Sequence, residues 1–437
     1  MRSVHRSKPF ARRAVASAAV AACAACAPAF ATDGYFPHGY GIKAMGMGGA
    51  SAAMAVDTFG GANNPASMVW AGSGLDLGLN FFSPKRNAER SGTAAFPPLD
   101  GKVESGNTHF LIPEFGYNQM IGGNMSVGVS VYGNGGMNTT YPQGPFQCPT
   151  GPTTSAPANM LCGSGTLGVD LMQLVVAPTL AYKLNAEHAV GASLLLGYQQ
   201  FKAYGLQSFE GLSSAPGSVT DNGYDRSTGL GLRVGYMGRL SDMVALGASY
   251  STKIKMGRFD KYKGLFAGGG KFDIPANYSL GLAFTPSPSW TLALDYQRIQ
   301  YSGIPSVGNS SMLPNPLGSA NGPGFGWKDI DVIKLGVAWR MSDALTLRAG
   351  YNHGGNPIRS QDVTFNILAP GVMTEHYTAG LSWAISKTDD ISVAGMIAPR
   401  KTVTGPSLLN GLMPFPVGNE TIGMRQTEIG IAWSRKF

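Results

Sequence analysis

The sequence has few charged residues. Asp, Glu, Lys and Arg make up only 13% of its 437 residues, about half of the roughly 25% that is usual in globular proteins. Disorder is excluded because it requires many charges and few aromatic residues, whereas 10% of this chain is aromatic. A coiled coil is excluded because its Ala-, Glu-, Lys- and Leu-rich composition is absent. Glycine is abundant, but the 61 glycines show no period of three, which excludes collagen.

Residues 1–31 are typical of a secretory signal peptide. They begin with basic residues, continue with an alanine-rich apolar run and end in Ala29-Phe30-Ala31, so cleavage is predicted after Ala31. A membrane anchor and lipoprotein processing at Cys23 are the alternatives. Loss of the five basic residues of this segment lowers the net charge from +8 to +3. A nucleic-acid partner is therefore not predicted.

Cysteine is rare, with only four residues in the chain. Two of them, Cys23 and Cys26, belong to the predicted signal peptide. The other two, Cys148 and Cys162, lie in a stretch rich in Pro, Gly and Thr. In an exported protein this pair is predicted to form a disulfide that closes a loop. A two-cysteine metal site is less favoured because no histidine is close in sequence, and neither a metal nor a cofactor is predicted.

Beyond residue 31 there is no run of about 18 apolar residues, so no transmembrane helix is predicted. Instead, apolar residues alternate with small or polar ones, which predicts strands with one apolar face. The pattern is clear in residues 230–236, 333–340, 377–385 and 429–437. A soluble sandwich would also alternate. However, Gly, Ser, Lys and Arg on the second face and Tyr or Trp at the ends of the apolar face favour a transmembrane barrel with a polar lumen.

The predicted connections alternate in length. Six short links are expected near Gly122-Gly123, Asn185-Ala186, Ser241-Asp242, Pro286-Ser287, Ser342-Asp343 and Thr388-Asp389. Seven long links are expected at residues 87–107, 133–168, 202–227, 256–275, 302–329, 352–374 and 401–424. Short periplasmic turns and long external loops are typical of bacterial outer-membrane barrels. The sequence therefore predicts an all-β fold, an antiparallel transmembrane β-barrel of about fourteen strands over residues 73–437, with both of its ends in the periplasm.

Residues 32–72 do not alternate and are rich in small residues. A barrel of about fourteen strands encloses a wide lumen, which is either an open pore or plugged. An N-terminal hatch inside the barrel is the economical interpretation. The Asn64-Pro65-Ala66 motif of this segment also occurs in aquaporins, but that family needs two copies on paired half-helices.

The chain resembles the FadL-type outer-membrane transporters of long-chain fatty acids and other hydrophobic compounds, including aromatic hydrocarbons. The resemblance covers the whole chain after the signal peptide and depends on the order and spacing of several short motifs. These are Gly34-Tyr35, Gly46-Met47-Gly48-Gly49-Ala50, Asp57, Asn64-Pro65-Ala66, Phe272-Asp273-Ile274-Pro275-Ala276, Leu347-Arg348-Ala349-Gly350-Tyr351 and His376-Tyr377-Thr378-Ala379-Gly380-Leu381.

The resemblance implies passive uptake of an apolar ligand through an external groove, an inner pocket beside the N-terminus and a kinked third strand, with sideways release into the membrane. The third strand, expected at residues 124–132, runs into Gly133-Asn134-Gly135-Gly136, the candidate kink and lateral opening. Candidate ligand contacts are Tyr35, Phe36, His38, Tyr40 and Met45 in the hatch, and Phe259, Tyr262, Leu265 and Phe266 as an exposed strip in an external loop. The alternative for these four loop residues is that the loop packs on its neighbours. Lumen-facing Arg233, Lys334, Arg340 and Arg348 would either bind a carboxylate or pair with acids of the hatch.

An enzyme is not favoured, since the scattered histidines form no hydrolase or metalloprotease motif. A general diffusion porin for small polar solutes is the nearer alternative, but it would not need about 40 residues before its first strand. The expected partners are a hydrophobic ligand, outer-membrane lipid with lipopolysaccharide, and the barrel-assembly machinery, which reads C-terminal aromatic residues such as Phe437. The chain is expected to be a monomer.

Overall fold

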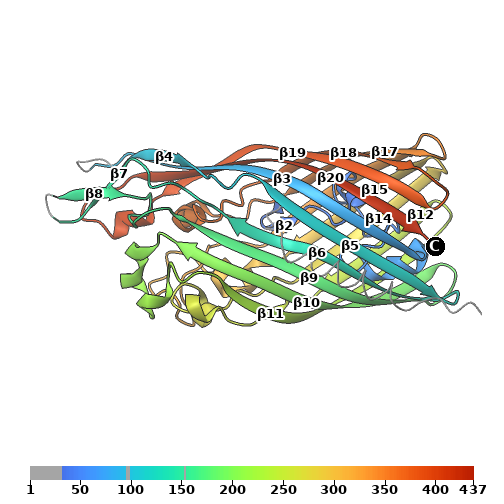
Figure 1. Ribbon diagram of the computed structural model, residues 1–437, viewed down its shortest axis with the longest axis horizontal. Helices are drawn as coiled ribbons and strands as arrows, with labels where there is room; N and C mark the ends of the chain where they lie inside the picture. Colours follow the sequence, from blue (N-terminus) through green and yellow to red (C-terminus); the bar gives the residue numbers. More distant parts are fainter. Residues whose placement is uncertain (1–31, 95–98, 152–153) are drawn as a thin grey trace, which may run out of the picture.

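The fold is a closed antiparallel β-barrel (Figure 1). The computed structural model describes residues 32–94, 99–151 and 154–437, so the predicted signal peptide lies outside the described residues. Consecutive strands pair with each other, and the last strand pairs with the first. The barrel strands are β3 (Gly74–Ser91), β5 (Phe110–Ile121), β6 (Met125–Asn138), β9 (Gly168–Lys183), β10 (His188–Tyr204), β11 (Asp225–Arg239), β12 (Val244–Ser251), β14 (Asn277–Ser287), β15 (Trp290–Ile299), β16 (Ile330–Arg340), β17 (Leu345–Gly354), β18 (Glu375–Ala384), β19 (Asp389–Pro406) and β20 (Asn419–Lys436).

These fourteen strands confirm the predicted number. The shorter elements are β1 (Thr32–Asp33), β2 (Phe36–Pro37), β4 (Gly101–Glu104), β7 (Phe146–Pro149), β8 (Ser155–Ala158), β13 (Lys255–Met256), the α-helices α2 (Ile42–Met45), α3 (Met68–Ala71), α4 (Ala267–Gly270), α5 (Pro305–Gly308) and α6 (Val363–Asn366), and the 3-10 helices η1 (Pro65–Ser67), η2 (Gln207–Leu212), η3 (Pro216–Ser218), η4 (Asp260–Tyr262), η5 (Tyr301–Gly303), η6 (Ser360–Asp362) and η7 (Leu408–Gly411). Within the described residues, no helix has the length and apolarity needed to cross a membrane.

The outer face of the barrel carries a band of exposed apolar side chains, as the alternation predicts. Leu230, Leu232 and Val234 of β11 are 54%, 43% and 43% exposed, whereas the intervening Arg233 is 4% exposed and points inward. The same alternation holds in β16, where Leu335 is exposed and Lys334 is buried. A water-soluble protein rarely exposes so large an apolar surface, so this band suits lipid.

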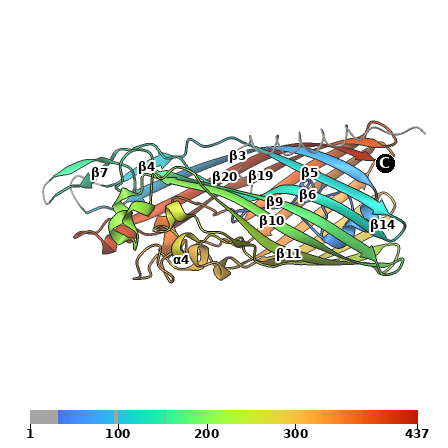
Figure 2. The same ribbon diagram turned by 60° about the horizontal axis from the view of Figure 1, so that its bottom comes forward.

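The two ends of the barrel differ. The six short turns and the C-terminus gather at one end, and the long loops gather at the other (Figures 1 and 2). Four turns lie where the sequence predicts them. The turn predicted at Pro286-Ser287 follows Ser287 instead, and the turn predicted at Thr388-Asp389 ends at Thr388.

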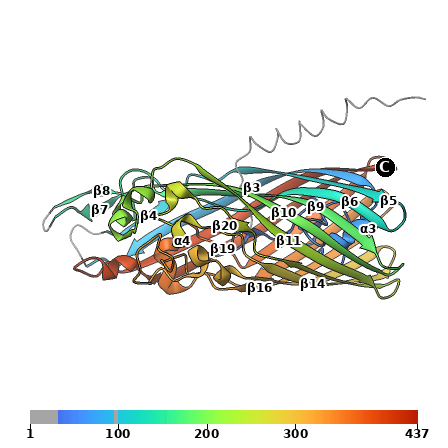
Figure 3. The ribbon, with the colours of Figure 1, turned by 90° about the horizontal axis from the view of Figure 1, so that it is seen from below.

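The strands beside the loop end extend further than the sequence predicts. β19 runs to Pro406 and β20 starts at Asn419, so much of the loop predicted at 401–424 is strand. The other long loops fold over the mouth of the barrel, where their apolar side chains join one buried cluster with the inner face of the strands (Figure 3). This end of the molecule is therefore packed.

Candidate functional site

Residues 32–72, called the N-terminal segment here, lie inside the barrel against its inner wall. Asp295 of β15 accepts hydrogen bonds from the backbone N–H groups of Ser51 (2.7 Å) and Ala52 (2.8 Å). Four strands away, on β19, Asp390 pairs with Lys43 at 3.0 Å. Buried polar groups need such partners because water cannot reach them. The wall therefore holds this segment from several sides.

The Asn64-Pro65-Ala66 motif is one of these anchors. The Asn64 side chain accepts a hydrogen bond from the Ala66 N–H and so caps η1. Its amide also donates to the carbonyl oxygens of Ala52 (2.7 Å) and Tyr236 (2.9 Å). A Cβ atom on Gly235 of β11 would lie 2.1 Å from Asn64 Oδ1, so only glycine lets the motif approach this strand. The motif thus fixes the segment to the wall.

Two of the four predicted lumen-facing cations bind backbone carbonyls of the N-terminal segment rather than its acids. Arg233 donates to the carbonyl oxygens of Gly61 and Ala62, and Lys334 donates to that of His38 at 2.9 Å. Arg348 donates to Ser382 of the neighbouring strand. Arg340 is exposed at the turn end of β16.

The five N-terminal residues predicted to line one inner pocket are all buried, but they face different spaces. Tyr35 faces a cavity beside β6. Tyr40 faces a polar cavity between the segment and strands β11 to β16. His38 and Met45 face a third cavity, and Phe36 packs on the ring of Tyr35 at 5.5 Å. The described residues therefore do not bring these five side chains to a single pocket.

The prediction of an exposed apolar strip in the loop after β12 is wrong. Phe259 and Tyr262 are fully buried, Phe266 is 5% exposed, and Leu265 packs against the same buried cluster. Their rings pack on Phe201 of β10, at 4.7 Å for Phe266. Burial also raises the pKa of the Tyr262 hydroxyl, which donates to the Gly223 carbonyl. Contacts with other loops, which sequence spacing does not reveal, cover this strip.

Two of these residues, Leu265 and Phe266, line an apolar cavity of about 40 Å³ under the long loops, called the outer cavity here. The remaining lining comes from β9, β10 and four other loops, and nearly all of it is apolar: Leu161, Val169, Phe201, Leu206, Phe209, Ser306, Leu317, Pro323, Gly324, Phe325, Phe365 and Leu368. Phe209 and Phe365 are far from Leu265 in the sequence and belong to no motif. Their place in the lining of the outer cavity is therefore visible only in the folded structure.

Strand β6 is irregular at the predicted kink. Its pairing with β9 shifts register between Gly133 and Gly135, which marks a bulge. Its pairing with β5 ends at Val131, opposite Phe115, although β6 continues to Asn138. The ladder between these two neighbours is therefore missing over the loop-side half of both strands.

The facing half of β5 pairs only with β3. Residues 110–114 align with β3 up to the Phe110–Phe82 pair and have no ladder partner on β6 among the described residues. Pro113 lies in this half and lacks an N–H donor, which suits a strand edge. The wall thus has a local break in its hydrogen bonding beside the glycine-rich part of β6.

The N-terminal segment lies against this break. A Cβ atom on Gly135 would lie 2.4 Å from the backbone oxygen of Tyr35 and 2.6 Å from its ring, so the two backbones are in close contact. The Tyr40 hydroxyl donates to Asn134 Oδ1 at 3.3 Å, and its ring packs on Tyr132 at 4.5 Å. The predicted association of the N-terminus with the third strand is therefore present as a contact.

A cavity of about 30 Å³ lies at this contact and is called the kink cavity here. The N-terminal segment, β3, β6, β20 and the loops before β16 and β18 supply its lining: Gly34, Tyr35, Phe82, Arg86, Gly136, Met137, Asn138, Trp327, Ala369, Pro370, Gly371 and Met424. The sequence singled out neither Arg86 nor Trp327. Arg86 lies on the same inward-facing side of β3 as Asp76, Asn80 and Phe82. The alternation along this strand could therefore have identified Arg86 as a residue that faces the lumen.

Toward the turn end, the space beside the N-terminal segment is polar. His38, Asn80, Glu114 and Glu428 line a small cavity there; the first three are buried and Glu428 is half-buried. Glu114 also accepts a hydrogen bond from the Gly41 N–H at 3.2 Å. An apolar molecule that entered this cavity would leave these polar groups without hydrogen-bond partners, which costs free energy. In the described residues, no cluster of His, Cys, Asp and Glu is suited to a metal ion.

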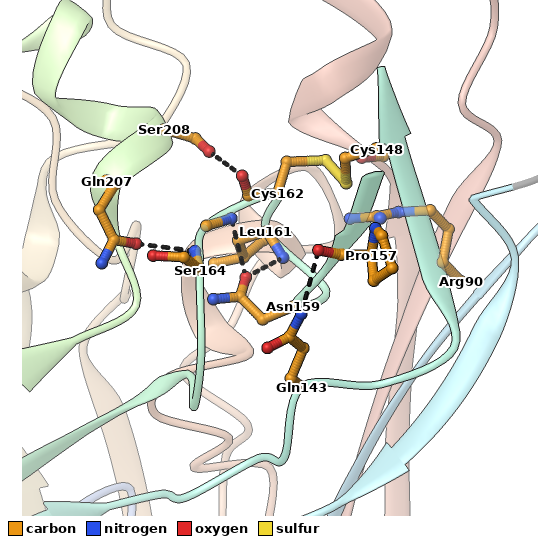
Figure 4. Close-up of a disulfide and its surroundings, with 12 residues drawn as sticks. Arg90, Gln143, Cys148, Pro157, Asn159, Leu161, Cys162, Ser164, Gln207 and Ser208 are labelled. Carbon is orange, nitrogen blue, oxygen red and sulfur yellow. Dashed lines mark hydrogen bonds between the residues drawn. A yellow bond between two sulfur atoms is a disulfide. The ribbon is translucent and has the colours of Figure 1, made fainter. Parts of the chain in front are cut away.

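Cys148 and Cys162 form a disulfide in the long loop after β6, with Cα atoms 5.5 Å apart (Figure 4). Cys148 is part of the β7–β8 hairpin. The Cys162 carbonyl accepts a hydrogen bond from Ser208 of the next long loop (Figure 4). The bridge therefore ties this hairpin to the neighbouring loop over the mouth of the barrel.

Replacing both cysteines, Cys148→Ser with Cys162→Ser, is expected to loosen this loop and leave the barrel intact. Closing a loop of about this length contributes roughly 3 kcal/mol. We expect faster cleavage between residues 139 and 167 in limited proteolysis, with unchanged resistance of the barrel to unfolding in SDS. Ser208→Ala, which removes only the hydrogen bond to Cys162, is the matched control. Equal cleavage rates for the double variant and the unaltered protein would contradict the expectation.

Comparison with known proteins agrees with this architecture. The sequence model of one family, described as outer membrane protein transport protein (OMPP1/FadL/TodX), matches residues 18–404. Similar solved structures include the P. putida toluene transporter TodX (TM-score 0.66, 19% identity, 92% of this chain and 99% of that one). Others are the Ralstonia pickettii toluene transporter TbuX (0.61, 18%, 92% and 99%) and a Pseudomonas aeruginosa FadL homologue (0.65, 14%, 92% and 100%). No curated protein sequence matches the chain.

Proposed function

Because this chain belongs to the OMPP1/FadL/TodX family of outer-membrane transport proteins, we propose that it carries hydrophobic small molecules inward by a lateral route. In this proposal residues 32–72 are a hatch that stays in place, and the ligand leaves through the barrel wall into the membrane. The observation that carries the proposal is the missing ladder between β5 and β6 in the part of β6 that the N-terminal segment contacts. The family membership also makes the protein an outer-membrane barrel, with its turn end toward the periplasm.

The first step of the route is the outer cavity. Its lining is almost entirely apolar and comes from loops at the external end, so an apolar ligand gains contact there. Each CH₂ group that leaves water contributes about 0.8 kcal/mol. Leu265 and Phe266 are ligand contacts in this proposal. Phe259 and Tyr262 do not line the cavity but pack on Phe201, which does.

The second step is the kink cavity and the break in the wall. Tyr35 and Gly136 both line this cavity, and the unpaired halves of β5 and β6 begin beside it. The carboxyl groups of Glu114 and Glu428, which line the next cavity toward the turn end, make the lumen there polar. Because an apolar ligand would enter that polar region only at a cost in free energy, it moves sideways into lipid instead. The transfer runs downhill and needs no energy source or catalytic residue.

The membrane environment and assembly are also part of the proposal. The ligand enters from the lipopolysaccharide-covered side, which blocks its direct partition. Phe437 is 63% exposed at the end of the chain, where the assembly machinery can read it. We propose a monomer, since the fourteen barrel strands of the described residues close on themselves, the last pairing with the first, and the barrel needs no strand from a second copy.

Uptake and permeation measured together test this function. Cells that express the protein should take up a labelled hydrophobic compound, such as dodecanoate or toluene, faster than cells without it. Liposomes that contain the purified protein should not swell with sugars, because the hatch fills the lumen. Empty liposomes and liposomes with an open porin are the controls. Sugar permeation like that of the porin, without hydrophobic uptake, would overturn the proposal in favour of a general diffusion porin.

A further inference from the structure

Two cations face each other on the outer surface of the barrel, where its first and last strands meet. Lys85 of β3 and Arg425 of β20 are direct partners in the strand register, and both side chains are exposed. They share the outward-facing side of their strands with Phe81 and Ile429, which also pair with each other. Like charges that are opposite across a ladder repel, because their Cβ atoms are only about 5 Å apart. The pair therefore carries a repulsion that only an anion or water can screen.

Arg400 of β19 is a third cation at the same place. The pairing of β19 with β20 has a bulge at this position. The exposed Arg400 side chain donates a hydrogen bond to Asn87 Oδ1 of β3 at 2.8 Å, so it reaches across β20. Gly423 of β20 leaves room for this contact, since a Cβ atom there would lie 3.4 Å from Arg400 Nη2. Gly423 precedes Arg425 by two residues on the same face. The three cations Lys85, Arg400 and Arg425 are called the cationic patch here.

No carboxylate among the described residues neutralises the cationic patch. None of its three cations forms a salt bridge in this part of the chain. Glu104 of β4, which aligns with Asn87, is exposed and pairs with none of them. Elsewhere on the outer face the fold does supply acids, and Arg298 pairs with Asp331 at 2.9 Å. The patch thus presents three positive charges that the chain itself leaves unneutralised.

The patch lies at the outer edge of the lipid-facing band. Phe81 and Ile429 are 39% and 56% exposed, and Lys85 and Arg425 lie four residues further toward the loop end of the same strands. At about 3.3 Å per residue, this separation is roughly 13 Å. The strands β3, β19 and β20 lie side by side there (Figure 1). Because the short turns of such barrels face the periplasm, the patch lies in the outer leaflet of the membrane.

We propose that the cationic patch binds the phosphate groups of lipopolysaccharide. Guanidinium groups match phosphate in charge and in hydrogen-bond geometry, and a lysine adds a point charge. Basic clusters beside an apolar membrane surface bind anionic lipid head groups. The acyl chains of the same molecule would cover the band at Phe81 and Ile429, a contact that a soluble phosphate ion lacks.

Such a lipid would also act on the closure of the barrel. Lys85 belongs to the first barrel strand and Arg425 to the last. A phosphate between them replaces their repulsion by two attractions, so the lipid stabilises the seam where the barrel closes. This inference does not depend on the route by which a hydrophobic ligand crosses the barrel.

Binding of lipid A, the phosphate-bearing lipid of lipopolysaccharide, to the purified protein in detergent tests the inference. Native mass spectrometry measures the affinities for bisphosphorylated lipid A and for the same lipid without its phosphates. A cation near a membrane surface contributes about fivefold in affinity, so Lys85→Gln with Arg425→Gln should weaken binding of bisphosphorylated lipid A about 25-fold. Binding of the dephosphorylated lipid should not change. Without lipid A, the double variant should be at least as stable as the unaltered protein, because the repulsion is gone.

Lys253→Gln with Arg298→Gln is the matched control. It removes the same number of positive charges from the loop end, but both cations already have partners, Asp273 at 3.8 Å and Asp331 at 2.9 Å. Its affinity for lipid A should equal that of the unaltered protein. An equal loss in both double variants would show attraction by net charge alone and would overturn the inference.

Two further outcomes would also overturn it. One is equal affinity of the unaltered protein for the two forms of lipid A. The other is displacement of lipid A by millimolar inorganic phosphate, which would assign the patch to the free ion. Uptake of dodecanoate by cells with the patch variant should stay normal, so failure of this inference leaves the proposed function in place.

Discussion

Gly135→Val is expected to reduce uptake of hydrophobic compounds to the level of cells that lack the protein. A Cβ atom at this position would lie 2.4 Å from the backbone oxygen of Tyr35, and the valine methyl groups would extend further into the same space. The N-terminal segment would have to move, and the new side chain would occupy the break beside β6. Overpacking of this kind costs about 1–3 kcal/mol, which a barrel with otherwise complete ladders tolerates. Uptake of labelled dodecanoate by cells with equal amounts of folded protein measures the effect.

Gly395→Val is the control for that substitution. Gly395 is also a glycine in a barrel strand, but the nearest atom to an added Cβ is the Glu428 backbone oxygen at 3.7 Å, an ordinary contact. We expect this variant to assemble and transport like the unaltered protein. Normal uptake by Gly135→Val, with folding shown by the shift of unheated protein in SDS gels, would mean that the ligand leaves elsewhere.

The barrel itself could be predicted from the sequence because its evidence is local. Alternation in 230–236 places Arg233 inward and its neighbours outward, and the structure confirms this arrangement. The number of strands follows from the alternating lengths of the connections, which need no knowledge of three-dimensional contacts. Strand ends were less predictable. Asn419 to Met424 resemble a loop in composition, but they pair with β19 and β3 in the folded chain.

The site could be predicted only in part. Gly133 to Gly136 carry a local signal, since glycines in a strand favour a bulge, and the structure has a register shift there. The exposure of Phe259 and Tyr262 was predicted wrongly, because their burial depends on Phe201 and other distant residues. Arg86 lies at the edge of the loop predicted at residues 87–107, and its place in the lining of the kink cavity is visible only after folding. Local patterns thus identify the wall, whereas long-range contacts define the cavities.

Deletion of residues 34–60 is expected to turn the protein into an open pore. These residues supply several of the contacts with the inner wall, including the bonds from Ser51 and Ala52 to Asp295 and the Lys43–Asp390 pair. The polar side chains released from them would face water, which solvates them without large cost. The strand ladders do not involve this segment, so the barrel should still form. Liposomes with the variant should swell with sugars that the unaltered protein excludes.

The same deletion should abolish uptake of hydrophobic compounds, because the kink cavity loses Gly34 and Tyr35 and the lumen fills with water. An apolar ligand then has no dry surface to follow from the outer cavity to the break in the wall. Removal of residues 143–165, a loop segment of similar length that contains both cysteines of the disulfide, is the control and should keep sugars out. A hatch deletion that stays impermeable to sugars would show that the long loops alone close the barrel. One that still transports dodecanoate would show that the route does not depend on the N-terminal segment.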